Sequence, residues 1–259
     1  MKTPRSFLRQ PSLYFHQPAI ADIKPVSDDD LSRVHPGIQG LDKAMEGGFL
    51  TNTVNLVGGG AGSGKSIFCM QYLVHGIEQC HEPGVYISFE ESERKILKNF
   101  KRFGWNLEKK IKDKKLALLY YTPEQVEKVI QVGGGPVRDV LESMGAKRLI
   151  IDSLTAFTLL HENELAQRRA CLKLFEAIHT WGVTAVVTAE QEPDPVQHRS
   201  TVMEFAVDGV ILLYNIRKED RRERSLEIFK GRGIAHSAKI YPFAIGEKGI
   251  VVYPEKSIF

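Results

Sequence analysis

The sequence is poor in cysteine and contains no long apolar run. Its cysteines are Cys69, Cys80 and Cys171, an odd number with no C-x-x-C pair. A disulfide framework or a structural zinc site is therefore not expected, and a reducing compartment fits this usage. No stretch approaches the roughly 18 apolar residues that cross a membrane, and no uninterrupted apolar segment follows the basic residues near the N-terminus. We expect a cytoplasmic protein without a membrane partner.

An excess of one charge is also lacking. The chain has 35 Lys and Arg against 32 Asp and Glu, a formal net charge of +3. That excess is too small to predict nucleic-acid binding by itself. Hydrophobic residues make up 42% of the 259 residues, which is enough for a sizeable core. This length suits one large α/β domain or two small ones.

The first 33 residues differ from the rest. Three prolines, Pro11, Pro18 and Pro25, punctuate them. Because proline disfavours helix interiors and central strands, we expect an extended or partly disordered arm over 1–33. Its aromatic side chains could dock on a neighbouring molecule, or the arm could be a loosely packed leader. The domain proper is expected over 34–259.

Apolar runs and amphipathic segments alternate along this domain. We expect buried strands at 53–57, 85–89, 116–121, 148–151 and 183–188, and helices at 67–79, 94–103 and 165–180. The segment 123–144 is expected to be helical at both ends, with a glycine loop at 133–136 between them. Such alternation predicts an α/β fold, in which helices flank a mostly parallel twisted sheet on both faces.

The last third changes character. Two apolar runs, 209–214 and 224–230, flank a charged segment, 217–222, and predict an antiparallel hairpin with a charged turn. A further short strand pair is expected around 246–249. Before the hairpin, 192–202 forms a polar loop after a strand, a common place for a mobile functional loop.

One stretch has the pattern of a phosphate-binding loop, G-x-x-x-x-G-K-[ST]. It runs from Gly59 to Ser66, between an apolar strand and a helix, which is the context that this motif requires. Glycines let the loop's N–H groups and the helix N-terminus approach phosphates closely. Lys65 would neutralise the β- and γ-phosphates of a nucleoside triphosphate, and Ser66 would help to hold Mg²⁺. The expected nucleotide-binding residues here are Gly60, Ala61, Gly62, Ser63, Gly64, Lys65, Ser66 and Ile67. The alternative is a glycine-rich turn without a ligand, which the complete motif disfavours.

A carboxylate at the tip of a buried strand fits the other half of such a site. Asp152 directly follows Leu149-Ile150-Ile151. In nucleoside triphosphatases an aspartate at this place helps to hold Mg²⁺. The alternative is an aspartate that caps the following turn, but the phosphate loop favours the metal role.

Two adjacent carboxylates, Glu90 and Glu91, end the second expected strand. Beside a bound triphosphate, paired carboxylates are costly unless a cation or a function compensates them. One of them could orient and deprotonate the attacking water, and we take Glu91 as the base with Glu90 assisting. The alternative is a solvated helix N-terminus, where acidic residues are favoured in any case.

A basic bend, Lys230-Gly231-Arg232-Gly233, closes the expected hairpin. Small residues beside the two cations would let both side chains extend from a tight bend toward a phosphate, which could be one on a neighbouring subunit. From spacing alone, a basic surface turn is the simpler interpretation.

Several of these motifs together resemble the KaiC-like branch of the RecA-type ATPases. The similarity extends from about residue 36 to 254. The motifs that carry it are Pro36-Gly37-Ile38-Gln39-Gly40-Leu41-Asp42, Tyr86-Ile87-Ser88-Phe89-Glu90-Glu91, Phe103-Gly104-Trp105, Ile151-Asp152-Ser153-Leu154-Thr155-Ala156, Thr188-Ala189-Glu190, Lys230-Gly231-Arg232-Gly233 and Tyr241-Pro242-Phe243. Together they are specific, whereas any one alone would not be.

The resemblance implies a RecA-like core, hydrolysis of ATP with Mg²⁺, and assembly into a ring, commonly a hexamer, with ATP between subunits. In the family's arrangement the phosphate loop, Glu90, Glu91 and Asp152 act within one chain. Lys230 and Arg232 would reach the γ-phosphate bound by the adjacent subunit. The resemblance also places His236 and Glu247 near the neighbour's nucleotide, and Arg102 near the base.

The chain also departs from the family's two-domain members. It matches a single domain, and no extension of the kind used for regulated autophosphorylation is evident, so kinase activity does not follow. We expect a regulatory or signalling ATPase with an unidentified protein partner. One alternative is a nucleotide-sensing assembly protein with negligible turnover. Another is a DNA-repair accessory, which is not favoured because 192–202 has no basic aromatic stripe.

Overall fold

The computed structural model describes residues 31–131 and 134–256. The expected N-terminal arm therefore lies almost wholly outside the described residues, and so does part of the glycine loop expected at 133–136. Of that loop, Gly135 and Pro136 belong to the first turn of a helix.

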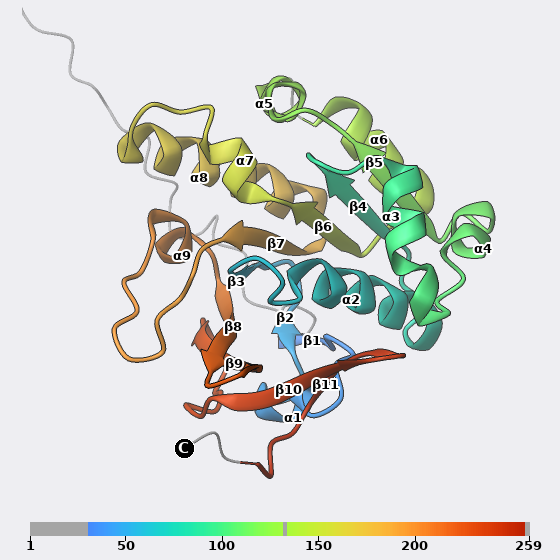
Figure 1. Ribbon diagram of the computed structural model, residues 1–259. Helices are drawn as coiled ribbons and strands as arrows, with labels where there is room; N and C mark the ends of the chain where they lie inside the picture. Colours follow the sequence, from blue (N-terminus) through green and yellow to red (C-terminus); the bar gives the residue numbers. More distant parts are fainter. Residues whose placement is uncertain (1–30, 132–133, 257–259) are drawn as a thin grey trace, which may run out of the picture.

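The described residues form a central sheet of nine strands in the order β11-β10-β9-β8-β3-β7-β6-β4-β5 (Figure 1). Its parallel strands are β3 (Val54–Gly59), β4 (Gly84–Ser88), β5 (Leu116–Tyr120), β6 (Arg148–Asp152), β7 (Thr184–Glu190) and β8 (Gly209–Lys218). Antiparallel strands extend the sheet beyond β8, namely β9 (Arg221–Gly231), β10 (Tyr241–Gly246) and β11 (Gly249–Val252). A separate pair, β1 (Arg33–Val34) and β2 (Phe49–Leu50), is antiparallel.

Helices cover both faces of the sheet (Figure 1). On one side lie α1 (Leu41–Ala44), α2 (Lys65–Gln79), α3 (Glu93–Phe100) with a 3-10 turn (Lys101–Phe103), and α4 (Leu107–Lys112). On the other lie α5 (Pro123–Gln131), α6 (Gly135–Met144), α7 (Leu154–Thr158), α8 (Glu164–Trp181) and α9 (Val202–Ala206). The predicted α/β fold with a C-terminal antiparallel hairpin is confirmed. Within the described ranges, no helix is long and apolar enough to cross a membrane.

The strand sequences explain this layering. Successive side chains of a strand point to opposite faces of a sheet. In β7, Val186 belongs to the hydrophobic core on the α2 side of the sheet, whereas Ala185 and Val187 belong to the core on the α8 side, and all three are fully buried. Because helices cover both faces of these strands, their side chains are buried on both sides and their sequences are largely apolar.

The parallel register brings the carboxyl ends of several strands to one edge. Gly59 at the end of β3 is paired with Glu190 of β7, and Ser88 at the end of β4 is paired with Asp152 of β6. The phosphate loop, Asp152 and the paired glutamates all follow strands that end at this edge. Ligands of open α/β sheets bind at such an edge.

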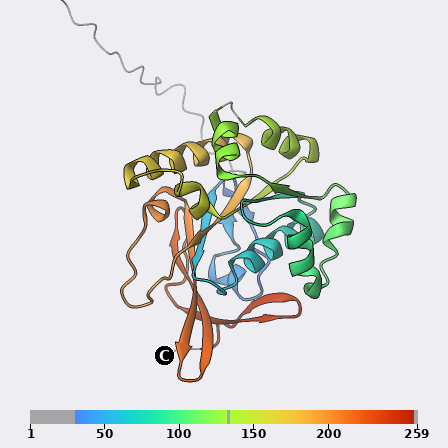
Figure 2. The same ribbon diagram turned by 45° about the horizontal axis from the view of Figure 1, so that its top comes forward.

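The C-terminal hairpin is longer than predicted. The charged segment 217–222 is not a turn, because β8 continues to Lys218 and β9 resumes at Arg221. Only Glu219, with a φ of 55°, and Asp220 make the turn. Figure 2 shows the hairpin projecting from the body of the molecule. The charged residues tolerate strand geometry here because they are exposed on this projection.

Candidate nucleotide-binding site

The predicted phosphate loop connects β3 to α2. Gly62 and Gly64 adopt φ values of 72° and 108°, a left-handed conformation that side chains with a Cβ rarely adopt. Lys65 is the first residue of α2, and its ammonium donates hydrogen bonds to the carbonyls of Gly59 at 2.8 Å and Gly60 at 3.2 Å. The loop thus curls around its own lysine. Its concave side combines this cation with the N-terminus of a 15-residue helix, an arrangement suited to phosphate.

Three hydroxyl groups surround the carboxylate of Asp152. Ser66 donates to Oδ2 at 2.9 Å, Tyr86 donates to the same oxygen, and Thr188 donates to Oδ1 at 2.5 Å. Burial, followed by the nearby charge of Asp152, raises the pKa of the Tyr86 hydroxyl well above its ordinary value, so that it remains a donor. These bonds fix the carboxylate at the sheet edge beside the loop.

The same oxygens suit a hard cation. Mg²⁺ prefers carboxylate, hydroxyl and phosphate oxygens, and it is usually bound by one or two protein oxygens together with phosphates. Ser66 and Asp152 supply such a pair next to the phosphate loop. Their donor chemistry therefore fits the predicted metal, and their role as ligands remains a prediction.

The two glutamates after β4 differ in their surroundings. Glu91 forms an ion pair with Lys95 at 2.9 Å, and Asn99 donates to both of its carboxylate oxygens at 3.3 and 3.2 Å. The hydrogen bond to Glu91 raises the pKa of Lys95. Glu90 is exposed and lies 3.5 Å from the hydroxyl of Ser153, the residue after Asp152. Glu91 is thus tied to α3, whereas Glu90 lies closer to the Asp152 cluster.

A cavity of about 400 Å³ lies at the mouth of the loop. Its lining residues are Gly62, Gly64, Lys65, Ser66, Ile67, Arg102, Arg224 and Ile245. Five of the eight predicted loop residues therefore share one cavity with Arg102, whereas Gly60, Ala61 and Ser63 do not line it. Arg224, which we did not predict from the sequence, donates to the carbonyl of Gly62 at 3.3 Å, and Asn215 donates to that of Ala61 at 3.3 Å. Both come from the β8–β9 hairpin, which buttresses the loop.

Lys230 and Arg232 lie at the opposite edge of the sheet. Lys230 donates to the carbonyls of Glu204 at 2.9 Å, Phe205 at 3.2 Å and Val207 at 2.6 Å, at the C-terminal end of α9. Burial, then the charge of Arg232, lowers the pKa of Lys230. Arg232 donates to the carbonyl of Phe205 at 3.1 Å and to Asp208 at 3.4 Å. Neither cation belongs to the loop cavity of its own chain.

His236 and Glu247 are also separate from that cavity. A second cavity of about 410 Å³ is lined by His236 with Lys43, Glu46 and Tyr241. Glu247 occupies the exposed turn between β10 and β11. Their predicted contacts with a nucleotide on another copy remain predictions.

A family model described as "ATPase: KaiC" matches residues 34–257. The chain belongs to the KaiC family of ATPases. The predicted resemblance is thereby confirmed, and with it a family whose members bind nucleotide.

Several KaiC-family relatives are similar over most of this chain. The circadian clock oscillator protein KaiC of Prochlorococcus marinus subsp. pastoris is 36% identical over 232 residues, which cover 86% of this chain and 45% of that protein. The chain thus spans less than half the length of such clock proteins. The UPF0273 protein MJ1359 of Methanocaldococcus jannaschii is 34% identical over 239 residues, 87% of this chain and 98% of that protein.

A solved KaiC-like structure has the same fold. The KaiC-like protein PH0186 of Pyrococcus horikoshii OT3 is 37% identical, with a TM-score of 0.75 over 86% of this chain and 100% of that structure. The expected RecA-type KaiC-like architecture is therefore confirmed.

Proposed function

We propose that this KaiC-family chain binds ATP with Mg²⁺ and hydrolyses it in a homo-oligomeric ring, a hexamer whose sites are shared between copies. The distance between the phosphate loop and Arg232 within one chain supports this proposal. The phosphate loop follows Gly59 at the end of β3, whereas Arg232 bonds to Asp208, whose carboxylate accepts from Val54 at the start of β3. Val54 and Gly59, the two ends of β3, are five residues apart, which corresponds to about 16 Å along a strand. Cations at that distance cannot serve the γ-phosphate of their own loop.

Binding is assigned to residues of one chain. Lys65 and the loop N–H groups would hold the triphosphate, and Arg102 would lie near the base. When bound, Mg²⁺ would be held by Ser66 and Asp152 and would neutralise phosphate charge. The hydrogen bonds from Tyr86 and Thr188 keep Asp152 oriented for that role.

Activation of water is assigned to Glu90, with Glu91 in support. This reverses the order expected from the sequence. Glu91 already has an ammonium and an amide as partners, whereas Glu90 lies beside the residue that follows Asp152. A base must be free to accept a proton at the reacting water, and only Glu90 meets this condition without breaking an ion pair.

The other half of each site would come from the adjacent copy. Lys230 and Arg232 would stabilise the charge that develops on the transferred phosphoryl group, and His236 and Glu247 would contact the same nucleotide. Hydrolysis would then alter the contact between copies. Such a change could be read by a protein partner, so we propose a cytoplasmic regulatory or signalling role.

A mixing experiment tests the shared site. Lys65→Ala removes the loop cation, and Arg232→Ala removes the cation offered to the neighbour, so each variant alone should lose most ATP turnover. When equal amounts of the two variants form a head-to-tail ring at random, half of the copies keep Lys65 and the other half keep Arg232. About one quarter of the interfaces then combine an intact loop with an intact arginine of the neighbour. Turnover should therefore return on mixing. If the mixture stays inactive while both variants assemble with ATP, the shared site is wrong.

A sensor with negligible turnover is the second candidate. The contacts of Glu91 with Lys95 and Asn99 favour it, since they occupy one of the two carboxylates. Glu90→Gln distinguishes the two proposals. An enzyme loses turnover in this variant, whereas a sensor retains ATP-dependent assembly with its low turnover unchanged.

A further inference from the structure

Like charges face each other across the β8–β9 hairpin. Its register pairs Arg217 with Arg222 and Lys218 with Arg221. Like charges directly opposite on neighbouring strands are destabilising. Two successive pairs of this kind destabilise the hairpin, and a nearby anion would offset that cost.

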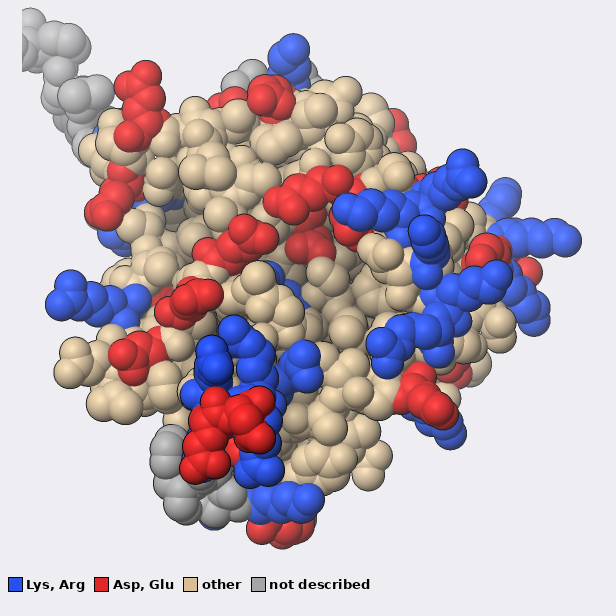
Figure 3. Space-filling model, in the orientation of Figure 1, with Lys and Arg blue, Asp and Glu red and all other residues tan. Residues whose placement is uncertain are grey.

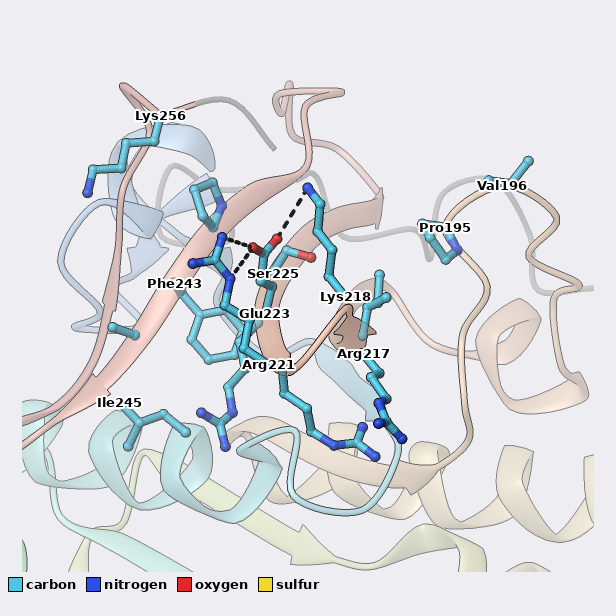
Figure 4. A pocket seen from close by; sticks show the side chains of 15 residues that line it. Pro195, Val196, Arg217, Lys218, Arg221, Glu223, Ser225, Phe243, Ile245 and Lys256 are labelled. Atoms are coloured by element: carbon cyan, nitrogen blue, oxygen red, sulfur yellow. Dashed lines mark hydrogen bonds and ion pairs between the residues drawn. The ribbon is translucent and has the colours of Figure 1, made fainter. Parts of the chain in front are cut away.

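Among the described residues, a carboxylate pairs with the facing cations on only one face of the hairpin. Glu223 forms ion pairs with Arg221 at 3.0 Å and with Lys218 at 3.7 Å, and Figure 4 shows it between the two. Because side chains alternate along a strand, Arg217 and Arg222 point to the other face.

The guanidinium groups of that other face bond to backbone carbonyls. Arg222 donates to Asn215 at 2.9 Å, Arg217 to Glu219 at 3.4 Å, and Arg224 to Gly62 of the phosphate loop at 3.3 Å. Within the described part of the chain, none of these three arginines forms an ion pair with a carboxylate. Figure 3 shows Lys and Arg side chains gathered over β8 and β9, with Asp and Glu side chains among them.

A cavity of about 880 Å³ lies against this hairpin. Phe243 and Ile245 of β10 form one wall, and Pro195 and Val196 lie on a separate loop across from it (Figure 4). Its charged lining consists of six cations and one carboxylate, namely Arg217, Lys218, Arg221, Arg222, Arg224, Lys256 and Glu223. Sites for small organic ligands are commonly of this size, with apolar walls and a few convergent polar groups.

The cavity adjoins the phosphate loop without being the same space. Arg224 and Ile245 line both this cavity and the one at the loop, whereas Arg217 and Arg222 line only the larger one. A ligand there would lie next to the loop-bound nucleotide, separated from it by Arg224.

We propose that this cavity binds a second phosphorylated organic molecule of nucleotide size. Arg217 and Arg222 hold its phosphate groups, because the planar guanidinium matches phosphate oxygens with two parallel hydrogen bonds. The wall of Phe243 and Ile245 accommodates its apolar body. The site does not depend on hydrolysis at the loop.

Calorimetric titration of the full-length Lys65→Ala chain tests the site, with ATP as probe at low salt and without Mg²⁺. One ATP per chain should still bind, and tripolyphosphate should compete whereas adenosine should not. Adding Arg217→Ala and Arg222→Ala should weaken this binding roughly tenfold or more, since two charge-assisted contacts are lost. The matched control is Lys109→Ala with Lys112→Ala, which removes two exposed cations of α4 and should leave binding unchanged.

Three results would overturn the proposal. The first is the absence of ATP binding by the Lys65→Ala chain, whose folding is checked by urea unfolding. The second is an equal loss of binding in the control pair, which would mean general charge attraction. The third concerns the chain with Lys65 intact: the double substitution Arg217→Ala and Arg222→Ala weakens ATP binding measured with Mg²⁺ but not ATP binding measured without it. The two arginines would then serve the loop nucleotide.

Discussion

The hydroxyl of Ser66 lies 2.9 Å from a carboxylate oxygen of Asp152, although 86 residues separate them in the chain. Ser66 follows the phosphate loop and Asp152 ends β6, and β7 lies between β3 and β6 in the sheet. The parallel register therefore places a hydroxyl and a carboxylate together beside the loop. This pair defines where a metal bound to a triphosphate would sit.

Asp152→Asn should remove most of the dependence of ATP binding on Mg²⁺. The amide keeps the size of the carboxylate but loses its charge, which a hard cation requires. We expect ATP affinity measured without Mg²⁺ to change little, whereas the gain on adding Mg²⁺ falls. Titration of a fluorescent ATP analogue at several Mg²⁺ concentrations measures both. An unchanged Mg²⁺ dependence would assign the cation to other residues.

Glu90→Gln should reduce turnover by roughly 100-fold or more, the usual contribution of a general base. Glu91→Gln should reduce it less, because Glu91 is bound to Lys95 and Asn99. Steady-state ATPase assays of both variants, with ATP binding measured alongside, decide the order. Lys95→Ala is the control, since it frees Glu91 without removing a carboxylate. A larger loss in Glu91→Gln than in Glu90→Gln would restore the order expected from the sequence.

Most of the fold could be predicted from the sequence, because apolar runs alternate with amphipathic segments. Strands such as β6 and β7 are apolar on both faces and end in polar residues, so their burial and direction follow from pattern alone. The glycine motif located the phosphate loop, since few other functions need glycine at that spacing between strand and helix. The short helices α4, α7 and α9 were missed because five or six residues carry little periodicity.

The partners of Asp152 and the buttress of the loop could not be predicted. Tyr86 and Thr188 are ordinary strand residues in the sequence, and only the sheet order brings them to the same carboxylate. Arg224 begins the strand that the sequence predicts at 224–230, but that pattern does not show that its side chain reaches the phosphate loop. The buried Leu226 and Ile228 lie on the same strand face as Arg224, so the pattern indicates a strand but not the contact with Gly62.

Gly76→Ala should destabilise the protein, although alanine is the better helix former. A Cβ at Gly76 would lie 2.3 Å from Nε and 2.4 Å from Cδ of Arg148. Arg148 is 1% exposed and cannot yield easily, because it pairs with Glu82 at 2.6 Å and donates to the carbonyls of His35 and Tyr72. Overpacking of this kind costs about 1–3 kcal/mol. The free energy of unfolding in urea measures it.

A double-mutant cycle identifies the cause of that loss. Arg148→Met gives a shorter, uncharged side chain at the position that the Cβ of Gly76→Ala would contact. Gly76→Ala should therefore cost less in the Arg148→Met background than in the natural chain. Equal costs in the two backgrounds would mean that the contact with Arg148 is not responsible.

The stability of the protein should fall between pH 7 and pH 5 partly because of His75. Burial, followed by the charge of Arg148, lowers the pKa of His75 below its ordinary value of 6.5. The unfolded chain thus binds a proton at a higher pH than the folded chain, so stability declines as the pH falls through 6.5 toward the folded pKa. His75→Gln removes this term and should flatten the decline, measured as urea unfolding free energy at each pH. The exposed His81, replaced by Gln, is the control; an equal slope in the natural and His75→Gln chains would contradict the assignment.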